Sequence, residues 1–448
     1  MSQDRLLIIG AGPVGLGMAN ALRANAIAYD QVEANDGVGG LWRKGAYASV
    51  HLNSSKHSTA YADYPMPADY PDFPNRAQML RYLEAFARDR GLLERIAFNR
   101  RVEHATPRVD DSWHVVFNDG EERIYKGVVV CNGHHWDPIR PDIPGSFAGD
   151  IIHSKDYDTP AQLARKRVLV IGGGNSGCDI ASEAARVAKR CDWSLREGYW
   201  FLPRAAFGRP LSDLPIWELP VLLQRPILRA IIRVTIGNYR AYGLKRPTHR
   251  IFDRHPAFGN EPLSYIKTGD ITPRPAVERV DGHTVHFADG SSGDFDLIVT
   301  ATGYHTRFPF LPDGLIPFRN GIAQLRSDAF SDHVKNLYVV GASQPRNGLG
   351  SLLTPVADFY AKLIRMQDEF DVPLGIVLKW TGEGMPTSNS VNPALARRYV
   401  WLGQHTLPVL RLMGRVLSRY HKRPPLTIAE PIRPDTLSRQ VDGPRPAA

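Results

Sequence analysis

Cysteine is scarce in this sequence, and long uncharged hydrophobic runs are missing from it. The 448 residues include three cysteines, Cys131, Cys178 and Cys191, which form no C-x-x-C pair and no zinc-binding pattern. This usage predicts a chain without disulfides in a reducing compartment, which we take to be the cytoplasm. Because no run of about 18 uncharged apolar residues occurs, we expect no membrane-spanning helix.

Several catalytic signatures are absent as well. The sequence has no G-x-x-x-x-G-K-[ST] phosphate loop, no G-x-S-x-G nucleophile elbow and no H-E-x-x-H pair. His134 and His135 are adjacent in "GHHWD", and adjacent histidines in a loop rarely bind one ion together, so we expect no metal site. The net charge of +9 favours anionic partners, such as dinucleotide phosphates or acidic lipid. No basic block or basic-aromatic stripe indicates nucleic acid.

A dinucleotide-binding fingerprint opens the chain. The apolar run 6–9 is typical of a buried parallel strand, and a G-x-G-x-x-G turn and a helical pattern follow it. Glu33 lies 23 residues after the first glycine, where a carboxylate accepts hydrogen bonds from ribose hydroxyls and repels a 2′-phosphate. The predicted residues of this site, which we assign to FAD, are Gly10, Gly12, Pro13, Gly15 and Glu33.

The same fingerprint occurs a second time, after the apolar run 168–171. Here Arg196 stands 24 residues after the first glycine, in place of the acid, and a guanidinium there can grip a 2′-phosphate. We therefore assign this site to NADP, although a solvated surface arginine with NAD bound is the simpler alternative. The predicted residues are Gly172, Gly174, Asn175, Ser176, Gly177, Ser194 and Arg196, with Ser194 as an added hydroxyl donor. Two nucleotide sites in one chain suggest hydride transfer from a nicotinamide to a flavin.

Between the two fingerprints stands an F-x-G-x-x-x-H-x-x-x-Y motif, formed by Phe147, Gly149, His153 and Tyr157. With it the sequence resembles the flavin-containing monooxygenases, which are class B flavoprotein monooxygenases. Further matching stretches are "GVGGLW" (37–42), "LNSSKHSTAYADYPMP" (52–67), "VVVCNGHHWDPIRPDIPG" (128–145), "DLIVTATGY" (296–304) and "NLYVVGASQ" (336–344). They run in the family's order from about residue 6 to about residue 360.

The resemblance implies a mechanism and further site residues. NADPH reduces FAD, O2 adds to the flavin C4a atom to give a hydroperoxide, and a soft nitrogen or sulfur nucleophile of a small-molecule substrate takes the distal oxygen. Asn53 matches the family's asparagine beside the flavin and is our catalytic candidate; its alternative role is that of a turn-forming residue. Further cofactor-binding candidates are Gly40, Leu41, Trp42, Thr302, Gly303, Tyr304 and Gly341.

Other reactions remain as alternatives. Related Baeyer–Villiger enzymes carry tryptophan where this chain has Tyr157, which argues against ketone oxygenation without excluding it. An uncoupled NADPH oxidase and a redox-sensing binding module stay open, whereas a disulfide reductase would need a cysteine pair near the flavin. We expect His153 to brace the linker and help place NADP rather than to act as a base.

The predicted fold class is α/β, with two nested, Rossmann-like, doubly wound dinucleotide-binding domains. Residues 1–160 and 296–371 form the FAD domain, which is interrupted by the NADP domain at 161–295. A helical insertion at about 211–242 is expected to pack on the NADP domain, with a lid or a membrane-surface helix as alternatives. Residues 372–448 form a C-terminal extension that we expect to pack on the FAD domain or to form a dimer contact. It contains a helix break at Pro408, its last residues are predicted to be disordered, and the oligomeric state stays open.

Overall fold

The structure, a computed structural model, describes residues 3–420 and contains two parallel five-stranded sheets. The first sheet has the order β25-β7-β1-β2-β3. Its strands are β25 (Leu337–Val339), β7 (Gly127–Val130), β1 (Leu6–Ile9), β2 (Tyr29–Val32) and β3 (Ile96–Ala97). Helices α1 (Pro13–Ala24), α3 (Arg76–Asp89) and α7 (Gly350–Met366) cover one face of this sheet and share its core. Strands β1 and β7 are buried along their whole length, as expected of parallel strands covered on both sides.

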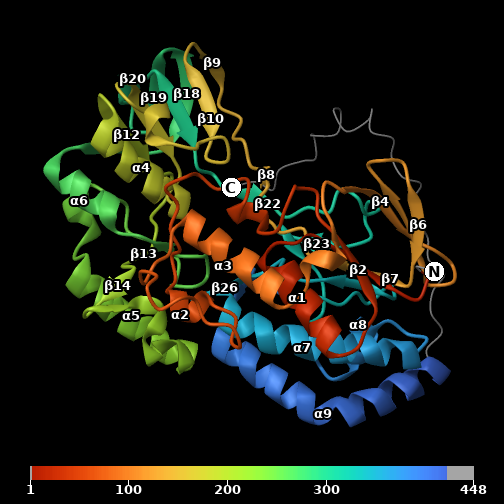
Figure 1. Ribbon diagram of the computed structural model, residues 1–448. Helices are drawn as coiled ribbons and strands as arrows, with labels where there is room; N and C mark the ends of the chain where they lie inside the picture. The colour runs from red at the N-terminus through yellow and green to blue at the C-terminus, as the bar shows by residue number, and fades with distance from the viewer. Residues whose placement is uncertain (1–2, 421–448) are drawn as a thin grey trace.

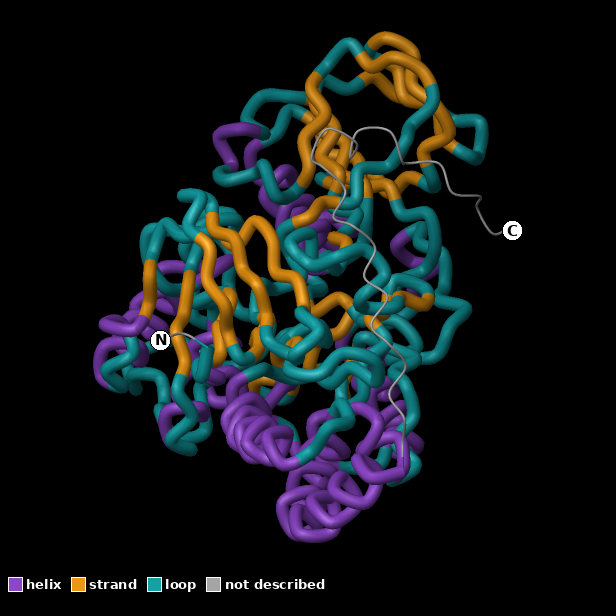
Figure 2. The backbone as a smooth tube through the Cα atoms, turned by 90° about the vertical axis from the view of Figure 1, so that its right-hand side faces the viewer, coloured by secondary structure: helices purple, strands orange, loops and turns teal. Residues whose placement is uncertain are grey.

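The second sheet repeats the arrangement in the order β10-β21-β11-β12-β17. Its strands are β10 (Asp150–His153), β21 (Leu297–Thr300), β11 (Arg167–Ile171), β12 (Arg190–Ser194) and β17 (Ile271–Arg274). Helices α4 (Asn175–Val187) and α6 (Glu261–Thr268) pack against it. Figure 2 shows the strands gathered in two groups, with helices concentrated below the lower group. The predicted α/β class with two Rossmann-like units is confirmed.

Two strands fall on the other side of the predicted domain boundaries. Strand β10 pairs with β21, and β21 also pairs with β11, so both belong to the second sheet. The sequence placed β10 within 1–160 and β21 within 296–371, that is, with the first sheet. The sequence of neither strand specifies its sheet, and only the hydrogen-bonded ladder decides between them. Residues 150–153 and 297–300 therefore move to the central unit.

Smaller sheets flank the two large ones. Strands β4 (Val102–Pro107), β5 (Trp113–Phe117) and β6 (Glu122–Tyr125) form an antiparallel sheet beside the first. Strands β19 (Thr284–Phe287) and β20 (Ser292–Asp294) form a hairpin around Asp289-Gly290, next to β18 (Val277–Gly282) and β9 (Gly145–Phe147). The remaining short pairs are β8 (Asp137–Pro138) with β22 (Tyr304–His305), β13 (Phe201–Leu202) with β16 (Ala257–Phe258), β14 (Ala205–Ala206) with β15 (Arg209–Pro210), β23 (Phe318–Arg319) with β24 (Ile322–Ala323), and β26 (Gln344–Pro345) with β27 (Ser390–Val391).

The insertion is helical, as predicted. It consists of η4 (Leu211–Asp213), η5 (Pro215–Glu218), α5 (Val221–Thr235) and η6 (Tyr239–Tyr242). Leu228, Ile231 and Ile232 of α5 are buried in the core of the second unit, whereas Leu222 and Val234 are 81% and 75% exposed. One face of α5 therefore packs as expected, and the other lines an apolar surface groove of about 500 Å³ beside η5.

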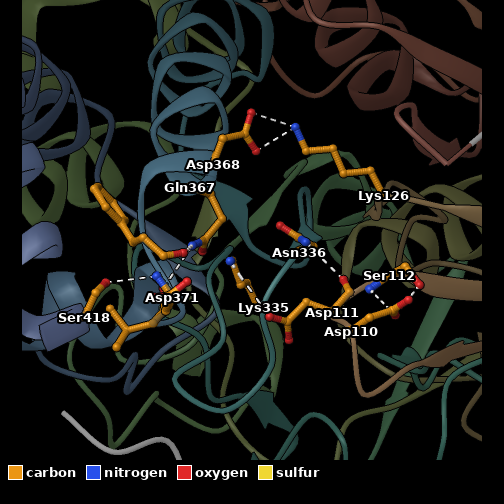
Figure 3. A network of polar contacts seen from close by, with 12 residues as sticks. Asp110, Asp111, Ser112, Lys126, Lys335, Asn336, Gln367, Asp368, Asp371 and Ser418 are labelled. Atoms are coloured by element: carbon orange, nitrogen blue, oxygen red, sulfur yellow. Dashed lines mark hydrogen bonds and ion pairs between the residues drawn. The ribbon is translucent and has the colours of Figure 1, made fainter.

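The C-terminal extension packs on the first unit. Helices α8 (Leu374–Trp380) and α9 (Pro393–Tyr420) lie beside α7, and α9 runs along the lower edge of the molecule in Figure 1. Figure 3 shows the polar contacts near this junction, including Lys126 with Asp368 at 2.6 Å and the Asp371 amide with Ser418 Oγ at 2.9 Å. The remaining short helices are η1 (Gly40–Trp42), α2 (Lys56–Thr59), η2 (Leu93–Arg95), η3 (Pro160–Gln162) and η7 (Gln367–Glu369).

The helix break predicted at Pro408 is wrong, because α9 continues through it. A proline removes one helical hydrogen bond, and here tertiary packing holds the helix on both sides of that position. Leu410 is buried, and Leu407 and Met413 pack on the core of the first unit. Among residues 3–420, no helix has both the length and the hydropathy that crossing a bilayer requires. The predicted disorder of the last residues concerns a segment outside the described residues.

A buried ion-pair group stabilises the second sheet. Asp192 on β12 is fully buried and accepts hydrogen bonds from Arg190 and, at 2.7 Å, from Arg274 Nε. We expect Asp192→Ala to lower the free energy of unfolding by about 3–5 kcal/mol, because it leaves largely buried Arg274 without a counter-ion. Urea unfolding checks this result. The exposed Asp313 provides a control: Asp313→Ala should change the same quantity by less than about 0.5 kcal/mol, and equal effects would contradict the assignment.

Candidate functional site

The first glycine turn joins β1 to α1 with almost no space for side chains. Gly10 has φ +107°, and a Cβ there would lie 2.5 Å from the Cys131 carbonyl oxygen. A Cβ on Gly15 would lie 2.1 Å from the carbonyl oxygen of Gly10. Helix α1 then begins at Pro13, and no described side chain caps it, so its first amides can face an anion. The turn thus has the shape that a dinucleotide pyrophosphate requires.

Glu33 and the segment 40–42 complete this first site. Glu33 is buried at the end of β2, and its Oε2 accepts a hydrogen bond from the Ala11 amide at 2.7 Å. A Cβ on Gly40 would lie 3.1 Å from the Gly12 Cα atom, so η1 passes directly over the turn. Leu41 follows Gly40 in η1, and Trp42 packs on the first core. The predicted FAD residues are therefore brought together.

The second glycine turn repeats this geometry between β11 and α4. Gly172 has φ +116°, and a Cβ there would lie 2.4 Å from the Ala301 carbonyl oxygen. A Cβ on Gly177 would lie 2.1 Å from the carbonyl oxygen of Gly172, the same distance as that between a Cβ on Gly15 and the carbonyl oxygen of Gly10. Gly174, by contrast, faces open space, which leaves room for phosphate at the start of α4. The second turn can accept a dinucleotide in the same way as the first.

The polar side chains around the second turn differ in whether they are free to bind a phosphate or already bonded within the protein. Arg196 is exposed just beyond β12 and makes no hydrogen bond or ion pair within the described part of the chain. Ser194 was predicted to donate to the phosphate, but its buried hydroxyl donates to the Pro275 carbonyl at 2.6 Å. The Asn175 side chain accepts a hydrogen bond from the Phe258 amide at 2.7 Å, and Ser176 contacts the Tyr47 hydroxyl. Arg196 is thus free for a 2′-phosphate, whereas Ser194 is not presented to it.

The four motif residues connect the linker to the second unit. Tyr157 is buried, and its hydroxyl contacts Glu183 on α4. A Cβ on Gly149 would lie 2.5 Å from the Asp296 carbonyl oxygen, and Phe147 packs with the hairpin core beside β18. His153 is buried at the end of β10, and its Nδ1 accepts from the Lys155 amide at 3.1 Å. Its ring meets the edge of Tyr304 at a centroid distance of 5.1 Å.

Asn53 lies just before the short helix α2. Its Oδ1 atom is buried and has no hydrogen-bond partner among residues 3–420. The role of helix cap, which Asn53 would play as a turn residue, belongs to Ser55, whose side chain accepts from the Ser58 amide. A buried amide oxygen without a partner is costly unless a ligand supplies one. The environment of Asn53 therefore fits a group bound there.

A cluster of neutral histidines fills the junction between the two units. His134 Nδ1 donates to the Gly341 carbonyl at 2.8 Å, and the amide nitrogen of Gln344 donates to Nε2 of both His134 (2.9 Å) and His135 (2.5 Å). Burial is the main cause that lowers the pKa of His135 to about 3, and burial also lowers the pKa of His134. In the sequence these two histidines were assessed only as possible metal ligands, and that role was rejected. Their place directly after a parallel strand was the signal that could have put them at the site.

The remaining predicted cofactor residues lie around this junction. The Thr302 hydroxyl donates to the Ile139 carbonyl at 2.5 Å, and the Gly303 carbonyl accepts from the Ile139 amide at 2.9 Å. Tyr304 packs against His135 with 5.5 Å between ring centroids. Gly341 approaches α1, where a Cβ would lie 3.0 Å from the Val14 side chain. No group of three or more His, Cys, Asp or Glu residues in the described part of the chain could hold a metal ion.

Comparison with known proteins decides the family. The profile described as "Flavin-binding monooxygenase-like" matches residues 3–364. The chain belongs to this family. It is 31% identical over 444 residues to flavin-containing monooxygenase 5 of Oryctolagus cuniculus, covering 91% of this chain and 80% of the relative. Against flavin-containing monooxygenase 5 of Homo sapiens it is 31% identical over 440 residues, with the same coverages. The chain is therefore an oxidoreductase, a monooxygenase that depends on FAD and NADP(H).

Solved structures share the fold. Flavin-containing monooxygenase from Stenotrophomonas maltophilia superposes with a TM-score of 0.62 at 24% identity, covering 82% of this chain and 99% of that one. Cyclohexanone monooxygenase from Rhodococcus sp. Phi1, bound to NADP+, gives a TM-score of 0.67 at 17% identity, with coverages of 90% and 97%. S-allyl-L-cysteine S-oxygenase from Allium sativum gives 0.62 at 20% identity, with 92% and 96%. Neighbours of different named activities thus share one architecture.

Arg196 should decide the choice between NADPH and NADH in this monooxygenase. We expect Arg196→Ala to raise the KM for NADPH about tenfold or more and to leave that for NADH nearly unchanged, because one charge-assisted contact to the 2′-phosphate is lost. Steady-state kinetics with both coenzymes checks this. Ser194→Ala is the matched control, since that hydroxyl is bonded to Pro275, and it should leave the ratio of the two KM values in place. A parallel rise for both coenzymes in Arg196→Ala would refute the phosphate contact.

The histidine cluster should make stability depend on pH. The folded chain holds the pKa of His135 at about 3, below its ordinary value of 6.5, so the unfolded chain takes up the proton first as pH falls. Above about pH 6.5 the histidine is neutral in both the folded and the unfolded chain, so its contribution to stability is complete. As the pH falls from about 6.5 to about 3, the free energy of unfolding should decrease by up to about 1.4 kcal/mol per pH unit. Urea unfolding of wild type and His135→Asn at several pH values measures this slope. The variant should show a shallower slope, whereas His104→Asn, at an exposed position on β4, should retain the wild-type slope.

Proposed function

We propose that this monooxygenase uses NADPH and O2 to oxygenate a nitrogen or sulfur atom of a small molecule. The observation that carries the proposal is the buried, unpartnered amide oxygen of Asn53. A primary amide both donates and accepts hydrogen bonds, so Asn53 can fix the orientation of a bound group without giving up or taking a proton. Reduced FAD supplies the activation of O2 when it is bound.

The junction around the site favours oxygen transfer over loss of oxygen as peroxide. The rings of His134 and His135 are neutral at neutral pH because their pKa values are lowered by burial, so they do not supply protons there. The packed rings of the two histidines and Tyr304 are only partly exposed, which limits the access of water to a reactive group. Tyr157, at the position where related Baeyer–Villiger enzymes have tryptophan, favours nitrogen or sulfur over ketone substrates.

Arg196 supports NADPH as the reductant. It is exposed beside the second turn, and among the described residues no carboxylate occupies it. In the first site the corresponding residue is Glu33, which would repel a 2′-phosphate. The opposite charges therefore favour FAD in the first unit and NADPH in the second.

Coupling between NADPH and product provides the test of the proposal. With a thioether or a tertiary amine as substrate, we expect each NADPH consumed to yield close to one sulfoxide or N-oxide, with little H2O2. A small ketone should instead increase H2O2 release. If every thioether and amine tried gives one H2O2 per NADPH and no oxygenated product, the chain is an uncoupled oxidase; ester formation from the ketone alone would establish the Baeyer–Villiger alternative.

Asn53→Ala should separate reduction from oxygenation. We expect the variant to retain bound FAD and to be reduced by NADPH at a rate within about twofold of wild type, while releasing most of the consumed oxygen as H2O2, because the fixed amide partner is lost. The measurement is H2O2 and sulfoxide per NADPH. Asn118→Ala, on the exposed turn after β5, is the matched control and should stay coupled. Wild-type coupling in Asn53→Ala would reduce Asn53 to a structural role.

A further inference from the structure

Arg346 lies on the loop between β25 and α7, and its backbone is held by the C-terminal extension. Strand β26 pairs in parallel with β27, and the Arg346 amide donates to the Val391 carbonyl at 3.2 Å. Its side chain is fixed as well: Nε donates to Ser390 Oγ at 3.0 Å, and the guanidinium carbon lies 4.3 Å from the centre of the Phe252 ring. Two distant segments, around Phe252 and at Ser390–Val391, therefore hold this arginine in place.

Among the residues that the structure describes, none serves as a counter-ion for this guanidinium. Its Nη1 atom is buried and has no hydrogen-bond partner, and no carboxylate among residues 3–420 lies within ion-pair distance of it. Two other arginines with little exposed surface are paired: Arg326 with Asp332 at 3.0 Å and Arg274 with Asp192 at 2.7 Å. A buried cation without an anion is costly, and burial lowers the pKa of Arg346, with the charge of Arg225 adding to the effect. Within residues 3–420 no side chain relieves this cost.

The loop places Arg346 next to the reaction site. Gly348 packs against α2, so that a Cβ there would lie 2.5 Å from the Ser58 carbonyl oxygen, and Asn53 lies just before α2. On the other side, Gln344 is two residues before Arg346 and bonds to both histidines of the junction. His255 also adjoins Arg346, whose charge helps to lower its pKa after the larger effect of burial. These histidines are neutral and offer the guanidinium no anion.

We propose that Arg346 binds a carboxylate of the substrate, so that this enzyme acts on small molecules that carry both a soft nitrogen or sulfur centre and an acid group. The planar fork of a guanidinium matches a carboxylate in two parallel hydrogen bonds, and the unpartnered Nη1 is one of the donors. The Ser390 hydroxyl and the Phe252 ring fix the fork before binding, which limits the entropy lost when the ligand binds. Oxygenation of the nitrogen or sulfur centre rests on the proposed function, whereas the binding of a carboxylate by Arg346 does not.

Binding to the oxidised, FAD-loaded enzyme tests the anchor without turnover. The probes are (methylthio)acetate and its uncharged amide, (methylthio)acetamide, titrated calorimetrically. We expect wild type to bind the acid about tenfold or more tightly than the amide, and Arg346→Ala to abolish that preference without weakening the amide. Arg346→Lys keeps the charge but not the fork and should retain only part of the preference. Arg229→Ala, which removes an exposed arginine of α5, is the matched control and should behave as wild type.

The outcomes separate the two proposals. Equal affinity of wild type for acid and amide, or an unchanged acid preference in both Arg346 variants, overturns the anchor. A weaker affinity of Arg346→Ala for NADPH, with its acid preference intact, also overturns it and assigns the guanidinium to the coenzyme phosphate. An acid preference that depends on Arg346, together with no sulfoxide from either probe, supports the anchor and counts against the proposed oxygenation. Thermal unfolding and FAD content of each variant confirm that it is folded.

Discussion

The structure depends on one constraint that occurs twice: a strand must turn into a helix so tightly that no side chain fits between the turn and the next strand of the sheet. In the first unit the backbone of Cys131 closes on Gly10, and in the second the backbone of Ala301 closes on Gly172. Each closing residue comes directly after a buried parallel strand, so the two strands and the helix dipole are fixed together. Everything that binds at the carboxyl edges of the two sheets is positioned from these two turns.

A second feature follows from the way the two sheets meet. The buried polar atoms without partners include Asn53 Oδ1, His153 Nε2 and Arg346 Nη1, and they come from three different parts of the chain. A folded protein ordinarily pairs such atoms, so unpaired ones near a glycine turn or a domain junction indicate a bound group. The exposed faces of α5 and α9, by contrast, combine apolar side chains with arginines such as Arg229 and Arg411, and they contain none of these buried, unpartnered atoms.

The sequence predicted those parts of the molecule that depend on local patterns. Gly10, Gly172 and the strands before them were found because a tight strand-to-helix turn requires glycines at a fixed spacing in the sequence. The sequence placed β10 and β21 with the first sheet, whereas they pair within the second, because the sequence of a short strand does not specify which strands it pairs with. The prediction for Ser194 failed for a related reason. Its spacing from Gly172 suits a phosphate contact, but its hydroxyl donates to the carbonyl of Pro275, which is 81 residues away in the sequence. Arg346 was missed because the two segments that support it, around Phe252 and at Ser390–Val391, are far from each other in the sequence.

The C-terminal extension illustrates how such supports change the meaning of a segment. The sequence predicted only that it packs on the FAD domain or forms a dimer contact, yet Ser390 and Val391 fix the loop that carries Arg346, and Arg397 on α9 contacts Glu218 of the insertion. The two segments with the least readable sequence patterns therefore contact each other, and the extension also holds the loop that carries Arg346. Under the proposal for Arg346, the glycine turns bind the cofactors and these segments influence the choice of substrate, because surface segments can vary without disturbing either nucleotide site.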